Sequence, residues 1–248
     1  MLFRSLTKEI KIEDKDKIIE NSLENLTMRD STFTVHKLNR EIAENAIGKL
    51  NIEEIGNSIK NAFEKTDVFE LGEKDSEKHF TTAEMFDLEK KLVESISERI
   101  GENKHIISRE NINSVLENRK TIKDEQKTAL ENVTRDGNGV SFLRGFAGAG
   151  KSYTMLAVKE AFESENYNVL GVSPTNKAAA ELEKSSGIKS TSIDSLLYKI
   201  KSNEINLHEK SVIIVDEGAM TDSRKTFLIN EYAKNNSVKL IYVGDEKQ

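Results

Sequence analysis

Residues 145–152, with the sequence Gly-Phe-Ala-Gly-Ala-Gly-Lys-Ser, carry the pattern in this chain that points most directly to chemistry. The spacing GxxxxGK[ST] lets a glycine-rich backbone curl until successive N–H groups point at one anion. An apolar run at 140–143 precedes the pattern and a helical pattern follows it, so the positive end of a helix adds to the attraction. A strand, a glycine-rich turn and a helix in this order predict a binding loop for a nucleoside triphosphate. The alternative is a glycine-rich connector that only joins a strand to a helix.

The residue types in this loop predict separate roles. The ammonium group of Lys151 would reach the β- and γ-phosphates, and the hydroxyl of Ser152 would ligate Mg²⁺. The remaining nucleotide contacts fall to the loop and to the first turn of the helix, at Gly145, Gly148, Ala149, Gly150 and Tyr153. The predicted cofactors are therefore a nucleoside triphosphate and Mg²⁺.

Two carboxylates with catalytic potential follow the apolar run 211–215. They are Asp216 and Glu217, and ligands bind at the carboxyl ends of parallel strands. Asp216 would hold Mg²⁺ mostly through water, while Glu217 would orient and deprotonate the water that attacks the γ-phosphate. The alternative is a buried strand that merely ends in polar residues, which leaves the pairing with the upstream loop unexplained.

Two glutamines complete the candidate site. Gln126 precedes the loop by a short helix and a connector, and its amide can make two hydrogen bonds to an adenine edge, which would select ATP. An ordinary solvated glutamine explains that position equally well. Gln248 closes the pattern Gly-Asp-x-x-Gln after the apolar run 240–243, where a glutamine can report the γ-phosphate to neighbouring elements.

The elements that position these residues alternate between helix and strand from residue 123 onward. Short apolar runs predict strands at 140–144, 168–172, 211–215 and 238–243. Helical periodicity predicts helices near 123–133, 151–165, 176–185, 192–200 and 222–234. Short apolar strands separated by helices imply an α/β fold, in which helices cover both faces of a parallel sheet.

The first part of the chain is organised differently. Residues 1–30 form a charged segment, and residues 31–120 form a mostly helical connector domain before the α/β domain at 121–248. Within the connector, helical patterns are followed by a hairpin with a polar tip at 72–78 and by a long charged helix from Ala83. This order predicts a winged-helix module or a helical bundle with a small ribbon. Such a domain would serve equally as a structural adaptor or as a DNA-reading domain.

Composition limits the compartment and the classes of partner. The 248 residues include no cysteine, so neither a disulfide framework nor a zinc–thiolate site is available. No apolar run approaches the ~20 residues that cross a bilayer, and the charged amino-terminal region lacks a secretory signal, which predicts a cytoplasmic protein. The net charge is −6, and residues 121–248 carry 17 Lys and Arg against 18 Asp and Glu. Any nucleic-acid contact therefore depends on a local groove rather than on overall charge.

The order of these motifs resembles that of superfamily 1 DNA helicases, and within them the RecD-like motor of TraA-type conjugative relaxase–helicases. The likeness runs from about residue 31 to the last residue. It rests on Gln126, the loop 145–152, the Asp216-Glu217 pair, Ser-Pro-Thr-Asn-Lys-Ala at 173–178, Thr-Ser-Ile-Asp-Ser-Leu-Leu at 191–197 and Gly-Asp-Glu-Lys-Gln at 244–248. The resemblance implies a RecA-like domain that binds Mg²⁺ and ATP, with Gln126 as the adenine-reading glutamine and Gln248 as the γ-phosphate sensor.

The resemblance also implies contacts to single-stranded DNA. The residues in question are Ser173, Pro174, Thr175 and Thr191. A tight turn at the end of a strand is the alternative, and a proline would suit it. The chain departs from the family at Gly218, where alanine or serine is usual. We therefore expect a looser turn that positions Glu217 less well.

Compared with a complete enzyme of that family, we expect two parts to be missing. One is a second RecA-like domain, whose arginines neutralise transition-state charge. The other is the relaxase, since His36, His79, His105 and His208 are scattered without metal-ligand spacing and are predicted to lie at the surface or at edges. The chain would then be a truncated or split motor with weak turnover alone, completed by a separately encoded helicase half or relaxase. Without a further strand, residues 140–144 would lie at an open sheet edge.

Three classes of function compete on this evidence. The first is the ATP-binding portion of a conjugative DNA helicase. The second is a non-catalytic DNA- or protein-binding remnant in which the nucleotide fold is vestigial. The third, a small-molecule phosphotransferase, lacks a basic lid segment and leaves the patterns at 191–197 and 244–248 unexplained.

Overall fold

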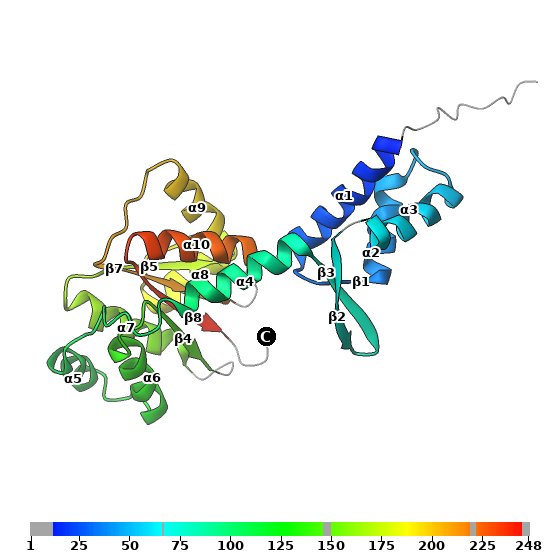
Figure 1. Cartoon of the computed structure of the whole chain (residues 1–248). Helices are drawn as coiled ribbons and strands as arrows, with labels where there is room; N and C mark the ends of the chain where they lie inside the picture. Colours follow the sequence, from blue (N-terminus) through cyan, green and yellow to red (C-terminus); the bar gives the residue numbers. More distant parts are fainter. Residues whose placement is uncertain (1–11, 66, 146–149, 219–221, 245–248) are drawn as a thin grey trace, which may run out of the picture. The chain divides into compact units, whose positions relative to one another are not determined.

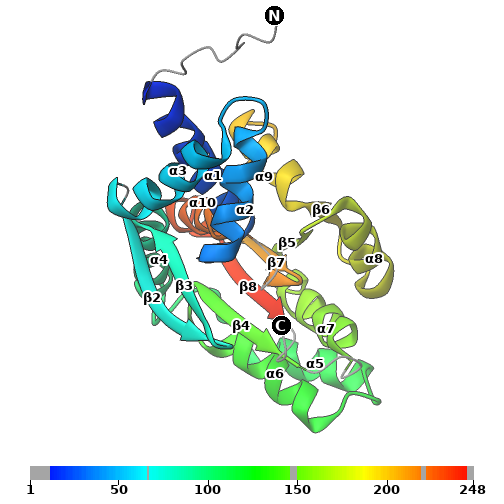
Figure 2. The same ribbon diagram turned by 90° about the vertical axis from the view of Figure 1, so that its right-hand side faces the viewer.

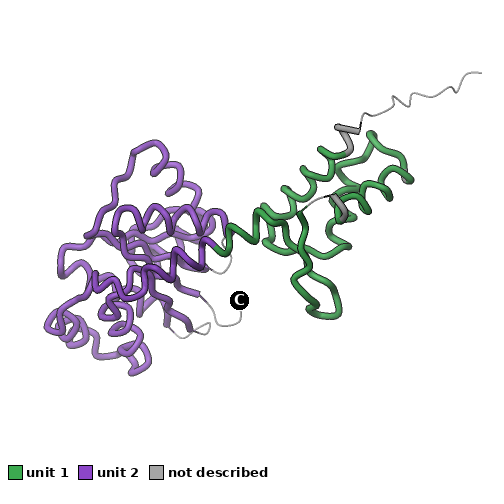
Figure 3. The backbone as a smooth tube through the Cα atoms, in the orientation of Figure 1, with its two compact units in different colours: residues 1–90 green, residues 91–248 purple. Residues whose placement is uncertain are grey.

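The computed structural model describes residues 12–65, 67–145, 150–218 and 222–244 (Figure 1). Contacts divide the chain into two compact units, residues 1–90 and 91–248 (Figure 3). The sequence predicts a domain boundary at residue 120 instead. The stretch before residue 120 joins the second unit because Ile112 and Val115 are buried in the same core as Val158.

The first unit packs three helices and a small antiparallel sheet around one core. Its elements are α1 (Ile12–Arg29), β1 (Phe33–Thr34), α2 (Val35–Ala46), α3 (Ile52–Lys65), β2 (Val68–Lys74) and β3 (Glu77–Thr82). The strand order is β1-β3-β2, and Phe80 of the middle strand packs against the rings of Phe33 and Phe63. The predicted hairpin is confirmed. The succession of helix, strand, two helices and hairpin fits the winged-helix alternative, which stays a prediction.

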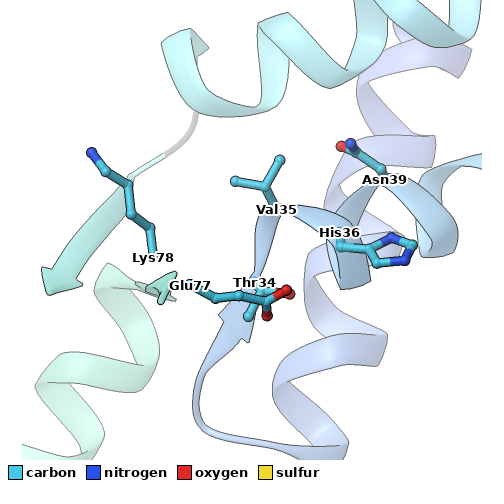
Figure 4. A pocket seen from close by; sticks show the side chains of 6 residues that line it. All are labelled: Thr34, Val35, His36, Asn39, Glu77 and Lys78. Atoms are coloured by element: carbon cyan, nitrogen blue, oxygen red, sulfur yellow. The ribbon is translucent and has the colours of Figure 1, made fainter. Parts of the chain in front are cut away.

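A pocket of about 330 Å³ opens on the first unit between the start of α2 and β3 (Figure 4). Glu77 and Lys78 contribute charges of opposite sign to its lining. Nearby, Phe69 and Leu71 of the hairpin are about half exposed. This surface is not the uniformly basic one that DNA binding favours, so the choice between DNA reading and a structural adaptor stays open.

The second unit is an α/β domain. Helix α4 (Ala83–Ser97) begins in the first unit and ends in this one. The other elements are α5 (Arg109–Asn118), α6 (Asp124–Arg135), β4 (Val140–Arg144), α7 (Lys151–Glu163), β5 (Asn168–Ser173), α8 (Asn176–Ser186), β6 (Ser190–Ser192), α9 (Ile193–Lys201), β7 (Ser211–Val215), α10 (Ser223–Asn235) and β8 (Lys239–Gly244). All the strand pairs are parallel, in the order β4-β8-β7-β5-β6.

Helices cover both faces of this sheet. Figure 2 shows α6 and α7 on one side and α10 on the other. In β7, Val212 and Ile214 belong to the core under α5–α8, whereas Ile213 and Val215 belong to the core under α9 and α10. Strand residues that are buried on both faces explain the continuous apolar runs in the sequence. The predicted α/β architecture is confirmed.

The predicted strands and helices of this domain lie within a few residues of the observed ones. Two short strands escaped prediction, β1 in the first unit and β6 in this domain, because two or three residues carry no periodic signal. At β6, Ser192 ends the strand and its hydroxyl then accepts a hydrogen bond from the N–H of Ser195, so α9 begins at Ile193. Among the described strands, β4 pairs only with β8, which is consistent with the expected sheet edge.

Candidate nucleotide-binding site

The predicted site residues gather at one edge of the parallel sheet. The loop after β4 leads into α7, and Asp216 follows the last residue of β7. Strand β8 lies between these two strands and ends alongside β4, with Arg144 opposite Gly244. Because all three strands run in the same direction, their carboxyl ends open on one edge, where α/β domains bind ligands.

The described ends of the loop have the geometry that a phosphate-binding turn needs. Gly145 donates its N–H to the carbonyl of Gly244 at 3.3 Å. Gly150 precedes α7 with φ +80, a left-handed backbone conformation that favours glycine, and a Cβ there would lie 2.4 Å from Nε2 of Gln126. Residues 146–149 lie outside the described residues, so the roles assigned to Gly148 and Ala149 stay predictions.

Lys151 and Asp216 lie close enough to interact electrostatically. The ammonium group of Lys151 donates to the carbonyl of Gly145 at 3.0 Å, at the start of the loop. Burial raises the pKa of Asp216, while a hydrogen bond from the backbone of Glu217 and the charge of Lys151 oppose that rise. A partly buried carboxylate beside an ammonium group suits the binding of a divalent cation with a phosphate.

The other two catalytic and metal positions adjoin these residues. Ser152 follows Lys151 in the first turn of α7 and is partly buried. Glu217 has φ +53, a left-handed backbone conformation that costs a residue with a side chain of order 1 kcal/mol or more. Such strain persists only where the surroundings enforce it, so the orientation of Glu217 is imposed by its neighbours.

Gln126 contacts the end of the loop. Its Oε1 accepts a hydrogen bond from the N–H of Lys123 at 3.0 Å, and its Nε2 donates to the carbonyl of Gly150 at 3.4 Å. The side chain is buried. Gln126 therefore caps α6 and supports the end of the loop. This excludes the alternative that its side chain is simply solvated. Its contact with adenine stays a prediction.

Tyr153 belongs to a polar cluster that sequence reasoning did not find. Its hydroxyl lies 3.0 Å from Oγ1 of Thr121, and the guanidinium carbon of Arg119 lies 4.9 Å from its ring centroid. Arg119 in turn donates two hydrogen bonds to the carboxylate of Glu160, at 2.6 and 2.7 Å. The hydrogen bond with Thr121 is the main cause of a lowered pKa at Tyr153. No local motif marks Arg119, because its partners lie in another helix.

The residues assigned to DNA lie at the ends of β5 and β6. Ser173 is buried, and its hydroxyl has no hydrogen-bond partner among the described residues. Pro174 follows it, and the exposed Thr175 uses its hydroxyl to cap α8 by accepting from the N–H of Ala178 at 3.1 Å. Thr191 pairs with Val172. The cap at Thr175 fits the tight-turn alternative, so the assignment to DNA stays a prediction.

Several expectations concern residues beyond this cluster. Gln248 lies outside the described residues. His105 is buried, so the prediction that every histidine lies at the surface or at an edge is wrong for this one. Within the described residues, no three His, Asp or Glu side chains gather in a way that could hold a metal ion. The helices of the described residues also include none with the length and apolar character needed to span a bilayer.

Comparison with known proteins gives a family for this arrangement. A family model described as an AAA domain matches residues 121–248, which include the loop, both carboxylates and all five parallel strands. The chain belongs to the AAA domain family. Membership implies nucleotide binding by this domain.

Curated relatives extend the comparison. The chain is similar to a probable conjugal transfer protein TraA of Sinorhizobium fredii, with 32% identity over 169 residues. It is also similar to conjugal transfer proteins TraA of Rhizobium radiobacter, at 35% over 127 residues, and of Agrobacterium fabrum, at 31% over 127 residues. The matches cover 68%, 51% and 51% of this chain but only 15%, 12% and 12% of the three relatives. The chain thus corresponds to a small part of each.

Proposed function

We propose that this chain supplies the ATP-binding portion of a helicase-type motor in conjugative DNA transfer. The observation that carries the proposal is the placement of Lys151, at the start of the helix that follows β4, and of Asp216, at the end of β7, on the same edge of the sheet, with only β8 between the two strands. Their charges interact there. The similarity to TraA proteins supports the biological setting, and the motif order that resembles superfamily 1 helicases supports the type of motor.

Each predicted site residue then has a defined task. Lys151 and the amides of the loop neutralise the β- and γ-phosphates of ATP. Ser152 and Asp216 would hold Mg²⁺, which supplies charge stabilisation when bound. Glu217 orients the attacking water and accepts its proton, and Gln248 senses the γ-phosphate.

Hydrolysis at a useful rate needs more than these residues. In proteins that this chain resembles, arginines from a second RecA-like domain neutralise the charge that develops on the γ-phosphate. An arginine of this kind is worth ~10³–10⁵ in rate in other nucleotide hydrolases. We therefore expect turnover to depend on a second motor domain, and single-stranded DNA to bind near Ser173–Thr175 and Thr191.

A titration with a fluorescent ATP analogue in the presence of Mg²⁺ tests the proposal. The substitution Lys151→Ala removes a charge-assisted contact worth about 1.5–3 kcal/mol, so affinity should fall about 10- to 100-fold. Lys184→Ala is the matched control, because this exposed lysine lies in the last turn of α8, away from the sheet edge that carries the loop. Absence of binding by the unsubstituted chain would favour the vestigial remnant.

A further inference from the structure

Gly218 directly follows Glu217, and its own backbone conformation does not require glycine. Its φ lies outside the left-handed range, in contrast to that of Glu217. A Cβ at position 218 would lie 2.9 Å from Cδ1 of Tyr242, closer than real Cβ atoms approach another heavy atom. The space that an alanine or serine side chain would occupy is therefore taken up by the ring of Tyr242.

Tyr242 is placed beside this turn by the sheet itself. It lies in β8, where it pairs with Phe142 of β4 on one side and with Val215, the last residue of β7, on the other. Its ring stacks on Phe142 with centroids 5.6 Å apart and an interplanar angle of 21°. The ring of a residue paired with Val215 can therefore extend under the turn that begins at Asp216.

Contacts with α10 hold the ring in place. The Tyr242 hydroxyl accepts a hydrogen bond from Nδ2 of Asn230 at 2.6 Å, and the same amide group donates to the carbonyl of Thr226 at 2.9 Å. Both Tyr242 and Asn230 are buried. A ring held by a strand, a stacked neighbour and a helix cannot easily yield to an added methyl group.

We propose that Tyr242 is a positioning residue for Glu217. Its ring packs against the turn at 216–218, and the missing side chain of Gly218 leaves room for that contact. Together, Tyr242 and Gly218 fix the left-handed backbone that orients the carboxylate of Glu217. The glycine that departs from the family pattern is then the partner of Tyr242 and does not loosen the turn. This inference rests on the proposed function, because it assigns the turn a role in ATP hydrolysis.

A double-mutant cycle tests the pairing. The variants are Gly218→Ala, Tyr242→Leu and the double substitution, with Tyr242→Phe as the control that keeps the ring and loses the hydroxyl. Hydrolysis of ATP is measured with a second motor domain supplied. Analogue affinity is measured in the presence of Mg²⁺, and the midpoint of thermal unfolding is measured in the absence of nucleotide. These readouts separate positioning of Glu217 from nucleotide binding and from folding.

The expected result is a loss of hydrolysis without a loss of binding. Gly218→Ala should lower the hydrolysis rate about 100-fold, as a misplacement of about 1 Å does, while analogue affinity changes less than about twofold. In the Tyr242→Leu background the same substitution should change the rate less than about threefold, because the clash is gone. Its effect on the unfolding midpoint should likewise disappear in that background, and Tyr242→Phe should stay close to the unsubstituted protein.

The opposite results overturn the inference. It fails if Gly218→Ala leaves hydrolysis unchanged, if its effect is the same in both backgrounds, or if hydrolysis and binding fall together. If the unsubstituted protein binds no nucleotide, the proposed function itself is refuted. The proposed role of Tyr242 in hydrolysis is then refuted as well, even if the unfolding measurements show that positions 218 and 242 are coupled.

Discussion

At both ends of the parallel strands a lysine lies near an aspartate, but the two surroundings differ. We call the end where the strands begin the amino edge and the end where they finish the carboxyl edge. At the amino edge, Nζ of the fully buried Lys239 donates to Asp136, to the carbonyl of Asn138 and to Ser141, at 2.6 to 2.9 Å. At the carboxyl edge, the pKa of Asp216 is raised by burial, and the charge of Lys151, whose ammonium group donates to the carbonyl of Gly145, opposes that rise. The first arrangement stabilises the fold, whereas the second has the properties of a ligand site.

The two lysines differ in how a structural charge and a functional charge are surrounded. A structural ion pair has its hydrogen-bonding capacity used within the protein, because an unsatisfied buried charge is costly. Backbone strain does not make this distinction, because Glu217 beside Asp216 and Ser237, two residues before Lys239, both have φ +53. Burial does make it, because Lys239 is fully buried whereas Lys151 is only partly buried.

Replacing both lysines in the same way should give the largest contrast. Lys239→Met leaves a partly buried carboxylate, the partly buried carbonyl of Asn138 and the buried hydroxyl of Ser141 without their donor, so we expect a loss of about 3 kcal/mol in the free energy of unfolding. Lys151→Met, which removes an ammonium group that is only partly buried, should cost less stability than Lys239→Met and should instead weaken nucleotide binding about 10- to 100-fold, as Lys151→Ala should. Denaturation in urea measures both variants, and equal losses would contradict the comparison.

The site residues at the carboxyl ends of the strands could be predicted from the sequence, because local motifs mark them. The loop 145–152 and the pair Asp216-Glu217 are contiguous motifs, and apolar runs place them at strand ends. The elements of the α/β domain were predictable for the same reason. The structure then brings the motifs together, which a linear pattern can only suggest.

The remaining features depend on residues far apart in the chain. From the sequence alone, Gly218 predicts a looser turn. Tyr242, which fills the space beside Gly218, lies 24 positions later, so no local pattern indicates the contact. Similarly, nothing near Lys239 in the sequence announces that Asp136 will be its partner. Contacts of this kind follow from strand order, and strand order has no signal in a single segment.

The amino edge should also make stability depend on pH through His105. Burial lowers its pKa from 6.5 to about 4, and the positive charges of Lys239, Arg99 and Lys104 act in the same direction against Glu102. Because the unfolded chain binds the proton from pH 6.5 downward and the folded chain does not, stability is lost as the pH falls from 6.5 to about 4. We expect this to amount to roughly 2 kcal/mol, since part of the shift is screened by solvent.

The substitution His105→Asn isolates that contribution. Residue 105 has φ +57, a conformation that asparagine tolerates, and the amide does not titrate. The free energy of unfolding should then vary less between pH 6.5 and 4 than in the unsubstituted chain, while titration of carboxylates below pH 5 remains. An unchanged slope over this range would mean that His105 is protonated equally in both states.

The smallest effect is expected at an ion pair outside the sheet domain. In the hairpin of the first unit, Nζ of Lys78 lies 3.0 Å from Glu70, and both side chains are about half exposed. Exposed pairs contribute little, because water and salt screen the attraction and ordering two long side chains opposes it. Lys78→Ala should therefore change the free energy of unfolding by less than about 0.5 kcal/mol in urea denaturation. A loss as large as that of Lys239→Met would show that geometry alone, without burial, makes an ion pair structural.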